Sequence, residues 1–368
     1  MKTLPKIKKV SDIPLATQVT ELLRKYIGEN CQPGEKFFSE RGLCQELELS
    51  RVTVGKAISS LVQEGFLYQE HGSGTYVAED KPQKVKPIAL MVYHCDNPFY
   101  SKIVRSIQEE ADRKGFQTVL LNSNGLVENE DIALRKVEDN VSGIILAPAL
   151  NPAGDFSKEL KRLIKKDFPL VVICHTGISD LKVNTVIPDF LTGGYATTEH
   201  LIKRGYRKIL FFAITDLFDR QDIHDRFEGY RQALEEHDLH FEKNWLVMAD
   251  GLDRFNGFFN DGYNAADRII PMVEGRTAIF SLGDSSAIGL MKGLREKGLR
   301  IPEDIGICGF DDIDLAAQWG IELTTVRISA SDIGRESTRI LSDCISNKAG
   351  RRIENIVSPV ELIIRKTA

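Results

Sequence analysis

From residue 88 onward, short apolar segments alternate with longer segments that have the apolar periodicity of a helix. The alternation begins with an apolar segment from Ile88 to Tyr93 and continues with a helical pattern from Phe99 to Lys114. Parallel strands must be joined by crossover connections, which are usually helices. The pattern therefore predicts an α/β fold, in which helices cover both faces of doubly wound parallel sheets.

The alternation occurs in two series, which predict two similar lobes. The first series runs from residue 88, and the second begins near Phe190. Later strands, at 323–327 and 355–365, are expected to be shared between the lobes. Folds of this type bind ligands in the cleft at the carboxyl ends of the strands. We assign lobe 1 to about 88–189 and 328–347, and lobe 2 to about 190–327 and 348–368.

The first 80 residues have a different pattern, which centres on one short helix from Ser50 to Gly65. Ser50 is a favourable N-cap, apolar residues follow at helical spacing, and Gly65 can end the helix in the left-handed conformation. A second helix, which begins after Ser39, lies a few residues upstream, as in a helix-turn-helix. With a third helix at 15–27 and an alternating hairpin at 66–77, we expect a winged helix-turn-helix.

Changes in composition mark the limits of this domain. Residues 1–14 form a lysine-containing arm, and residues 79–87 hold two prolines and three lysines, which is typical of a linker. The winged domain is therefore expected at 15–78 and the two-lobe domain at 88–368. A chain of 368 residues is long enough for two or three domains.

The nearly balanced charge of the first 80 residues argues against a general, non-specific nucleic-acid binder. They hold ten Lys and Arg against eleven Asp and Glu, and the whole chain has a net charge of −5. Specific DNA can still be bound through a local basic patch, for which the candidates are Arg41, Arg51 and Lys56 together with the basic tail, Lys6, Lys8 and Lys9. Such phosphate contacts predict an affinity for DNA that falls as the salt concentration rises.

The cysteines and the apolar segments argue against several classes of protein. The six cysteines form no CxxC pair, so we expect free thiols in a reducing compartment and no metal site. We find no secretory segment and no run of about 18 apolar residues, so we expect a cytoplasmic protein without membrane contact. No Ser/His/Asp or HExxH arrangement is present, and we interpret residues 94–96 as coil at a strand end. We therefore expect neither an enzyme nor a cofactor.

Several motifs stand in order within the first 80 residues. They are Pro33-Gly34-Glu35-Lys36, Ser39-Glu40-Arg41, Leu49-Ser50-Arg51, Thr53-Val54, Glu64-Gly65 and Gly72-Ser73-Gly74-Thr75-Tyr76-Val77. In this order they resemble the DNA-binding domain of GntR-family transcription regulators. The resemblance implies that Arg41, Arg51 and Thr53 contact operator DNA, and that Gly72 and Gly74 let the wing approach the minor groove.

The DNA-contacting candidates on this basis are Ser39, Arg41, Ser50, Arg51, Thr53, Lys56, His71, Gly72, Ser73 and Gly74. One position departs from the family pattern. Gly55 stands where many relatives carry a basic residue just after the Thr-Val pair. Base readout at that position is therefore open, and Lys56 beside it is a candidate for phosphate contact.

A second set of motifs occurs along the rest of the chain. It includes Asn97-Pro98-Phe99, Ser142-Gly143-Ile144-Ile145-Leu146, Gly193-Gly194-Tyr195, Arg226-Phe227-Glu228-Gly229-Tyr230, Ile301-Pro302-Glu303-Asp304-Ile305, Gly309-Phe310-Asp311-Asp312 and Leu323-Thr324-Thr325-Val326-Arg327. These motifs resemble the effector domain of lac-repressor-family regulators, which is itself similar to periplasmic sugar-binding proteins. Joined to a GntR-type head, the combination resembles the arabinose-responsive repressors.

The second resemblance implies a set of effector-binding residues: Asn97, Phe99, His175, Asp189, Arg226, Asp284 and Asp311. Arg, Asp and Asn suit a sugar, because each can bond two adjacent hydroxyl groups. Each of these residues could instead have a structural role. Asn97 could belong to a turn, Phe99 to the core, and the three aspartates could be N-caps. Arg226 could be an exposed residue at a helix start, and His175 a loop residue. Cys174-His175 stands where relatives commonly have an Asp-Arg pair.

The expected function is that of a homodimeric transcription regulator, favoured as a repressor, which binds operator DNA and responds to a small sugar or sugar derivative. A two-fold dimer would present two winged domains to a pseudo-palindromic site. One alternative is a soluble sugar-binding or scaffold protein whose winged domain binds protein. A second alternative is a sugar-modifying enzyme on an α/β frame, which predicts turnover.

Overall fold

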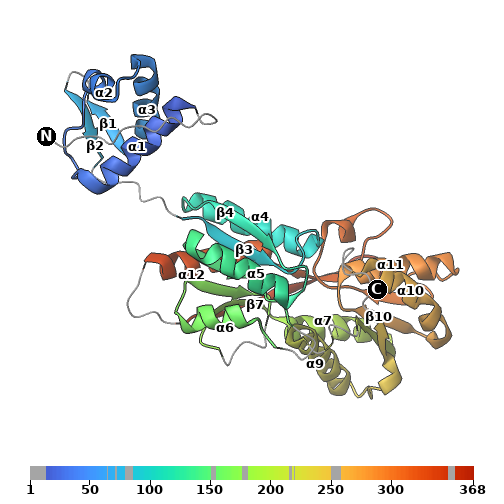
Figure 1. Cartoon of the computed structure of the whole chain (residues 1–368). Coiled ribbons are helices and arrows are strands. Elements are labelled where there is room, and N and C mark those ends of the chain that lie inside the picture. Colours follow the sequence, from blue (N-terminus) through green and yellow to red (C-terminus); the bar gives the residue numbers. More distant parts are fainter. Residues whose placement is uncertain are drawn as a thin grey trace. The chain divides into compact units, whose positions relative to one another are not determined.

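The computed structural model describes residues 14–63, 65–70, 73–78, 86–150, 155–175, 181–214, 218, 220–249, 258–346 and 353–368. Contacts divide the chain into two compact units, Met1–Val85 and Lys86–Ala368. We call the first unit the head and the second the two-lobed unit, and each is described by itself (Figure 1).

Three helices and a hairpin form the head. These elements are α1 (Leu15–Asn30), α2 (Glu40–Leu47), α3 (Arg51–Gln63), β1 (Leu67–Glu70) and β2 (Gly74–Val77). Leu23 and Ile27 of α1 meet Leu43 of α2 and Ile58 of α3 in one core, and none of the four has exposed surface. Packing of such apolar faces, more than helix propensity, stabilises helices of this length.

The turn between α2 and α3 is short, as the sequence predicts. Glu48 ends α2 in the left-handed conformation, with a φ of 53°. Ser50 then caps α3, because its Oγ accepts a hydrogen bond from Thr53 N at 3.2 Å. β1 and β2 pair in antiparallel register, with Glu70 opposite Gly74. The predicted winged helix-turn-helix is confirmed.

Lobe 1 of the two-lobed unit is built on a six-stranded sheet in the order β13-β7-β6-β5-β3-β4, whose pairings are parallel. Its elements are β3 (Ile88–Val92), α4 (Pro98–Arg113), β4 (Thr118–Asn122), α5 (Val127–Val137), η1 (Glu138–Asn140), β5 (Gly143–Leu146), α6 (Lys158–Lys165), β6 (Leu170–Ile173), β7 (Asn184–Pro188), α12 (Ala330–Ser346) and β13 (Asn355–Ser358). Alternate residues of β3 enter opposite cores. Ile88 and Leu90 join the core that contains α4 and α12, whereas Ala89 and Met91 join the core that contains α5 and α6.

Lobe 2 has a four-stranded parallel sheet in the order β11-β10-β8-β9. Its elements are α7 (Phe190–Lys203), β8 (Lys208–Ile214), α9 (Gln221–Glu236), η2 (Lys243–Trp245), β9 (Leu246–Ala249), α10 (Phe259–Ile269), η3 (Ile270–Met272), β10 (Thr277–Ser281), α11 (Asp284–Glu296), β11 (Ile305–Cys308) and η4 (Asp314–Ala317). Both lobes therefore have the doubly wound α/β architecture that the sequence predicts, and this prediction is confirmed.

Glycines allow the helices of lobe 2 to touch in pairs. A Cβ atom on Gly194 of α7 would lie 2.1 Å from the carbonyl oxygen of Arg226 in α9. A Cβ atom on Gly289 of α11 would lie 2.0 Å from the carbonyl oxygen of Phe259 in α10. Both distances are far below van der Waals contact, so these close approaches require glycine.

The chain crosses between the lobes at three described places. β7 leads into α7, β12 (Thr325–Ile328) leads into α12, and β13 leads into β14 (Val360–Ile363). β12 and β14 form an antiparallel pair of their own. β12 also touches the end of the lobe 2 sheet, since Thr324 bridges to Cys308 and Arg327 bridges to Asp311.

The end of the chain corrects one prediction. The sequence predicts a single strand at 355–365 and assigns all of 348–368 to lobe 2. Instead, β13 pairs with β7 in the lobe 1 sheet, and β14 pairs with β12. Pro359 separates the two strands, and a proline cannot donate a sheet hydrogen bond. The assignment of 355–358 to lobe 2 is therefore wrong.

Candidate functional site

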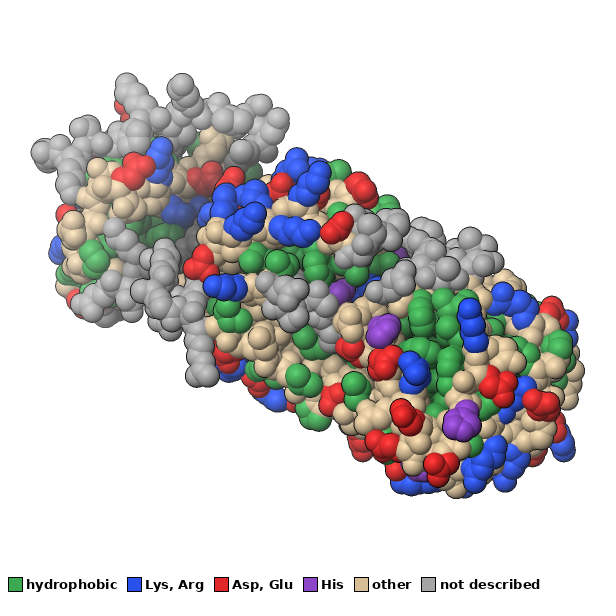
Figure 2. All heavy atoms as spheres, turned by 90° about the horizontal axis from the view of Figure 1, so that it is seen from below, with side chains coloured by type: hydrophobic (Ala, Val, Ile, Leu, Met, Phe, Trp, Pro, Cys, Tyr) green, Lys and Arg blue, Asp and Glu red, His purple; other side chains and the backbone are tan. Residues whose placement is uncertain are grey.

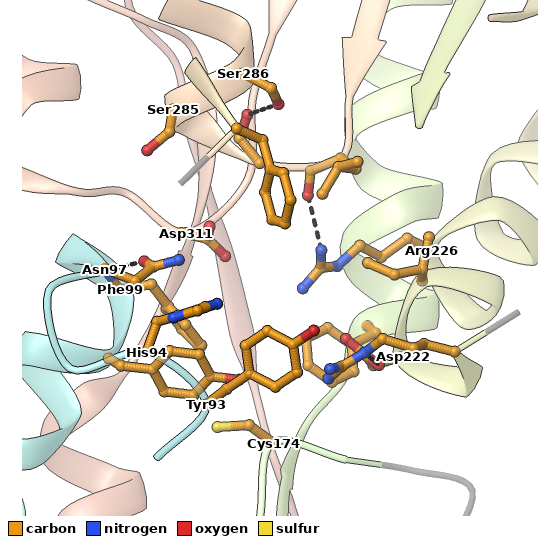
Figure 3. A pocket seen from close by; sticks show the side chains of 17 residues that line it. Tyr93, His94, Asn97, Phe99, Cys174, Asp222, Arg226, Ser285, Ser286 and Asp311 are labelled. Carbon is orange, nitrogen blue, oxygen red and sulfur yellow. Dashed lines mark hydrogen bonds and ion pairs between the residues drawn. The ribbon is translucent and has the colours of Figure 1, made fainter. Parts of the chain in front are cut away.

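A cavity of about 700 Å³, its open mouth included, lies between the two lobes (Figure 3). Its lining includes residues that follow strands of both sheets: Tyr93 and His94 after β3, Cys174 after β6, Leu282 after β10 and Asp311 after β11. The carboxyl ends of parallel strands are where folds of this type hold ligands.

Lobe 1 contributes an amide and aromatic rings to the cavity. Asn97 is the N-cap of α4, because its Oδ1 accepts a hydrogen bond from Phe99 N at 2.9 Å. Among the described residues its Nδ2 group has no hydrogen-bond partner. Phe99 meets Tyr100 edge to face, with ring centroids 5.0 Å apart. Asn97 therefore has the turn role that the sequence left open, and it also lines the cavity.

Arg226 enters the cavity from α9 in lobe 2. Its guanidinium lies against two aromatic rings, with Cζ 4.6 Å from the centroid of Phe190 and 4.3 Å from that of Phe310. Nη1 donates to the carbonyl oxygen of Leu282 at 2.7 Å, while the buried Nε has no hydrogen-bond partner. The residue is only 5% exposed, so the alternative of an exposed arginine at a helix start does not apply. The ring contacts and the bond to Leu282 hold the guanidinium in place, and the remaining N–H groups can serve a ligand.

Asp311 faces the cavity from the segment after β11 (Figure 3). Its backbone has a φ of 110°, which is a strained conformation for a residue with a side chain. Among the described residues, nothing donates a hydrogen bond to its carboxylate. Burial raises the pKa of this carboxyl to about 7; Arg226 and Lys102 oppose the shift, and the charge of Asp222 adds to it. The result is an open hydrogen-bond acceptor that changes protonation near neutral pH.

A buried ion pair, Arg220 with Asp222, completes the lobe 2 side of the cavity. Arg220 Nε lies 3.0 Å from Asp222 Oδ1, and the side chains are 11% and 8% exposed. Burial is the largest single influence and opposes both charges, but the partner's charge and hydrogen bond, together with other nearby groups, outweigh it. The pKa of Arg220 is therefore raised and that of Asp222 is lowered. The guanidinium also lies over the ring of Tyr93 in lobe 1, 5.1 Å from its centroid. This contact therefore joins the lobes at the cavity.

His175 does not line the cavity, although its neighbour Cys174 does. The imidazole is 2% exposed and packs edge to face on Phe156, with centroids 5.1 Å apart. Burial lowers its pKa to about 4, with a contribution from the charge of Arg220, so the ring is neutral at pH 7. Neither ring nitrogen has a hydrogen-bond partner among the described residues.

Two of the predicted aspartates also lie outside the cavity lining, because their carboxylates have structural partners. Asp189 is the N-cap of α7 and accepts bonds from Thr192 N and Oγ1 at 3.0 and 2.7 Å. Asp284 has no exposed surface and accepts bonds from Ile313 N at 2.8 Å and Thr325 Oγ1 at 2.5 Å. Direct effector contact by either residue does not fit these positions. Of the predicted effector-binding residues, the cavity brings together Asn97, Phe99, Arg226 and Asp311.

The cavity also contains residues that the sequence did not single out as ligand contacts: Tyr93, His94, Tyr100, Arg220, Asp222, Ser285 and Ser286. A signal existed for those that follow β3, since strand ends are where such folds bind ligands. The sequence interpretation of residues 94–96 as strand-end coil overlooked it. For Arg220 and Asp222 no local signal existed, because charged residues at a helix start usually face solvent.

In the head, two of the three serines predicted to contact DNA act as helix caps. Ser39 Oγ accepts from Gly42 N at 3.1 Å, and Ser50 caps α3. In the wing, Ser73 Oγ lies 2.5 Å from Tyr76 Oη. Gly74 has a φ of 131°, a backbone conformation that favours glycine.

The basic DNA-binding candidates of the head, Arg41, Arg51 and Lys56, are all exposed, and Thr53 is half-buried. Arg51 Nε lies 3.5 Å from a carboxylate oxygen of Glu40, a pair open to solvent. The predicted wing residues 71 and 72 lie outside the described residues.

Charges on the two-lobed unit are mixed. On the face shown in Figure 2, its basic and acidic side chains lie interspersed. Within the described ranges, no group of three or more His, Cys, Asp or Glu side chains could hold a metal ion. Among the helices that the structure describes, none has both the length and the hydropathy of a membrane span.

Comparison with known proteins agrees with this architecture. The family described as bacterial regulatory proteins, gntR family, matches residues 15–77, and the periplasmic binding protein-like domain matches residues 198–368. The arabinose metabolism transcriptional repressor of Geobacillus stearothermophilus is 29% identical over 374 residues, which cover 100% of this chain and 98% of that protein. The HTH-type transcriptional repressor PurR of Vibrio atlanticus is 31% identical over 271 residues, 73% of this chain and 77% of that protein. The chain therefore belongs to the family of transcriptional repressors that includes this PurR protein.

Solved structures resemble this repressor as well. A LacI family regulator from Enterococcus faecium with bound ribose has a TM-score of 0.63 and 26% identity, and the match covers 77% of the repressor and 98% of that chain. The regulator CelR in complex with cellobiose has a TM-score of 0.67 and 21% identity over 96% of the repressor and 98% of that chain, which shows the fold alone. Both resemblances stated from the sequence are confirmed, and these relatives are regulators rather than enzymes.

Proposed function

We propose that this repressor binds operator DNA through its head and a small sugar or sugar derivative in the interlobe cavity, and that the sugar sets its affinity for DNA. The observation that carries the proposal is the cavity, into which Asp311 and Arg226 point from opposite sides (Figure 3). The Asp311 carboxylate can accept hydrogen bonds and the remaining N–H groups of Arg226 can donate them, which suits a ligand with adjacent hydroxyl groups. The ribose bound by the Enterococcus relative supports this class of ligand.

The predicted residues that line the cavity divide the recognition of a sugar among them. The Asp311 carboxylate accepts bonds from two hydroxyl groups, and the unpaired N–H groups of Arg226 donate to a third oxygen. Asn97 donates through Nδ2, and the ring of Phe99 packs on an apolar face of the sugar. Arg220, whose Nε is committed to its aspartate partner, has Nη groups left for a further ligand oxygen.

The head supplies the DNA contacts. α3 lies in the major groove with Arg51 and Lys56 on its exposed side, Arg41 contacts a phosphate, and the wing reaches the minor groove. Because these contacts are mostly with phosphate, the affinity for DNA falls as salt rises.

Two copies of the chain act as a homodimer in the cytoplasm and bind a pseudo-palindromic operator. The sugar changes DNA binding only if it prefers one arrangement of the lobes, because a ligand that binds both arrangements equally shifts nothing. The interlobe contact between Arg220 and Tyr93 beside the cavity supports such a preference, since any movement of one lobe against the other changes it.

The first test is a thermal-shift screen of pentoses, hexoses, deoxyhexoses, their phosphates and small oligosaccharides. A ligand at about a hundred times its Kd adds roughly 2.7 kcal/mol, which is several degrees for a unit of this size. One sugar should shift the wild type but not Arg226→Ala. Arg231→Ala, on the same helix with a side chain 52% exposed, is the matched control and should behave as the wild type.

The second test is footprinting of the promoter region with and without that sugar. A protected inverted repeat whose occupancy changes with the sugar is the expected result. Saturable sugar binding without any protected DNA would favour the alternative, a sugar-binding or scaffold protein whose head contacts protein. If no compound in the panel shifts the wild type, the sugar class is wrong.

A further inference from the structure

The outward face of α3 is defined by the residues that it buries. Val54, Ala57 and Ile58 have no exposed surface and pack in the core of the head. Successive residues of a helix are rotated by about 100°, so the direction opposite to these side chains passes through positions 52, 56 and 59. All three positions are exposed. Val52, in the first turn, therefore lies at the centre of the face that a DNA groove would meet.

An apolar side chain at this position needs an explanation. Val52 is 69% exposed, and it is the only large hydrophobic side chain among the described residues of the head that is exposed to solvent. A single exposed valine is ordinary on a protein surface. This one, however, stands between Arg51, whose side chain is 87% exposed, and the exposed Lys56. The face therefore combines one apolar group with flanking positive charges, which suits an anionic partner that carries an apolar group.

Ser50 and Thr53, two small polar residues close to Val52 in the sequence, are engaged with one another. Ser50 Oγ accepts from Thr53 N at 3.2 Å and lies 2.8 Å from Thr53 Oγ1. Gly55, one turn further, places no side chain beside the valine, and a Cβ atom built there would meet only Glu40 Oε1, at 3.9 Å. The methyl groups of Val52 are thus open to a surface that approaches the first turns of α3.

We infer that Val52 selects a thymine in each operator half-site by packing against its C5-methyl group. In the major groove, this methyl group is the apolar feature of the base-pair code, and the other features are hydrogen-bond donors and acceptors. Arg51 and Lys56 are placed to hold phosphates on either side and so fix the register. The inference rests on the proposed function, because it requires the head to bind DNA with α3 in the major groove.

The test replaces thymines one at a time with deoxyuridine, which lacks only the C5-methyl group, in an operator found by footprinting or by selection from random duplexes. Removing one buried methyl group should lower the affinity of the wild type about fourfold per half-site. One thymine in each half-site should show this loss. Val52→Ala should bind the unmodified operator with a similar loss and should be nearly insensitive to deoxyuridine at that position.

Two further variants keep the test specific. Val52→Thr retains the branched shape and one methyl group, so it should retain part of the sensitivity to deoxyuridine. Val119→Ala removes methyl groups from a 37% exposed valine in the two-lobed unit and should leave DNA binding unchanged. Because Val52 is exposed, its variants should unfold at the wild-type temperature.

The outcomes separate this inference from the proposed function. If the wild type binds no selected duplex, the proposed function itself fails. If it binds but no thymine is sensitive to deoxyuridine, or if Val52→Ala keeps the full sensitivity, the role of Val52 is refuted and DNA binding stands. A Val52→Ala variant that changes its state of association while keeping wild-type affinity for DNA would mean that the valine contacts protein, which also refutes the inference.

Discussion

Replacing Asp311 by asparagine should change how the stability of the two-lobed unit depends on pH. Burial raises the pKa of this carboxyl to about 7, whereas an aspartate in an unfolded chain titrates near ~3.9. Between these values the folded protein keeps a proton that the unfolded chain has released. The free energy of unfolding of the wild type therefore falls as pH rises, by up to about 1.4 kcal/mol per pH unit.

From pH 5 to pH 8 this fall amounts to about 3 kcal/mol, since the slope disappears above the folded pKa. The asparagine variant lacks the titrating group, so its free energy of unfolding should gain on the wild type by about that amount over the same range. Urea unfolding at several pH values measures the difference. Asp267→Asn, with a side chain 72% exposed on α10, is the matched control and should keep the wild-type slope. Parallel pH profiles for the wild type and Asp311→Asn would refute the reasoning.

The same carboxyl should couple effector binding to proton release. Sugar hydroxyl groups donate to the ionised carboxylate and favour it, so the bound ligand lowers the pKa of Asp311. Below pH 7, binding then releases up to one proton and the affinity rises with pH. Calorimetry at pH 6, in two buffers of different ionisation enthalpy, counts the protons released. No release from the wild type, or equal release from Asp311→Asn, would show that this carboxylate accepts no bond from the ligand.

Three other substitutions follow from the packing. Lys102→Met removes an ion pair at 2.8 Å from α4 to Asp314 and a hydrogen bond to the carbonyl oxygen of Asp312, both of which cross between the lobes. It also removes a charge that opposes the raised pKa of Asp311. Calorimetry at pH 7 should therefore show effector affinity about two- to fivefold lower, and an unchanged affinity would contradict this interlobe role. Gly289→Ala places a Cβ atom 2.0 Å from the carbonyl oxygen of Phe259. Thermal unfolding should therefore show that the free energy of unfolding falls by roughly 1–3 kcal/mol or more. A more stable variant would contradict the packing argument. Burial raises the pKa of Glu130 to about 7, so this carboxyl lowers the free energy of unfolding of the wild type between pH 5 and pH 8, a contribution that Glu130→Gln lacks. Urea unfolding should show the variant gaining stability relative to the wild type over this range. If the difference between the two proteins does not change with pH, the raised pKa is contradicted.

Local features of the sequence were sufficient for most of the architecture. Ser39 and Ser50 could be recognised as caps because a cap bonds a backbone N–H only three residues away. Alternating strands and helices likewise carry their periodicity within each segment. The point where a strand changes sheet has no such mark in its hydrophobic pattern. For 355–365 the available signal was Pro359, which ends one ladder before the next begins.

Arg220 and Asp222 show why part of the cavity could not be predicted. In the sequence they belong to a charged stretch at the start of a helix, which is typical of a solvated surface. In the structure their side chains are only 11% and 8% exposed, because they pair with each other and Tyr93 covers the guanidinium. Tyr93 lies in the other lobe, more than a hundred residues earlier in the chain. The burial of this pair is thus a property of the assembled lobes.

Asp284 and Asp311 make the same point for two residues that the sequence treats alike. Both follow a strand end, and a carboxylate at either place could bind a ligand. The fold distinguishes them, because the oxygens of Asp284 accept bonds from Ile313 and Thr325, which lie 29 and 41 residues away in the chain. Among the described residues no such donor reaches the Asp311 carboxylate. A sequence can therefore nominate strand-end carboxylates, but long-range hydrogen bonds decide which of them keeps its oxygens for an effector.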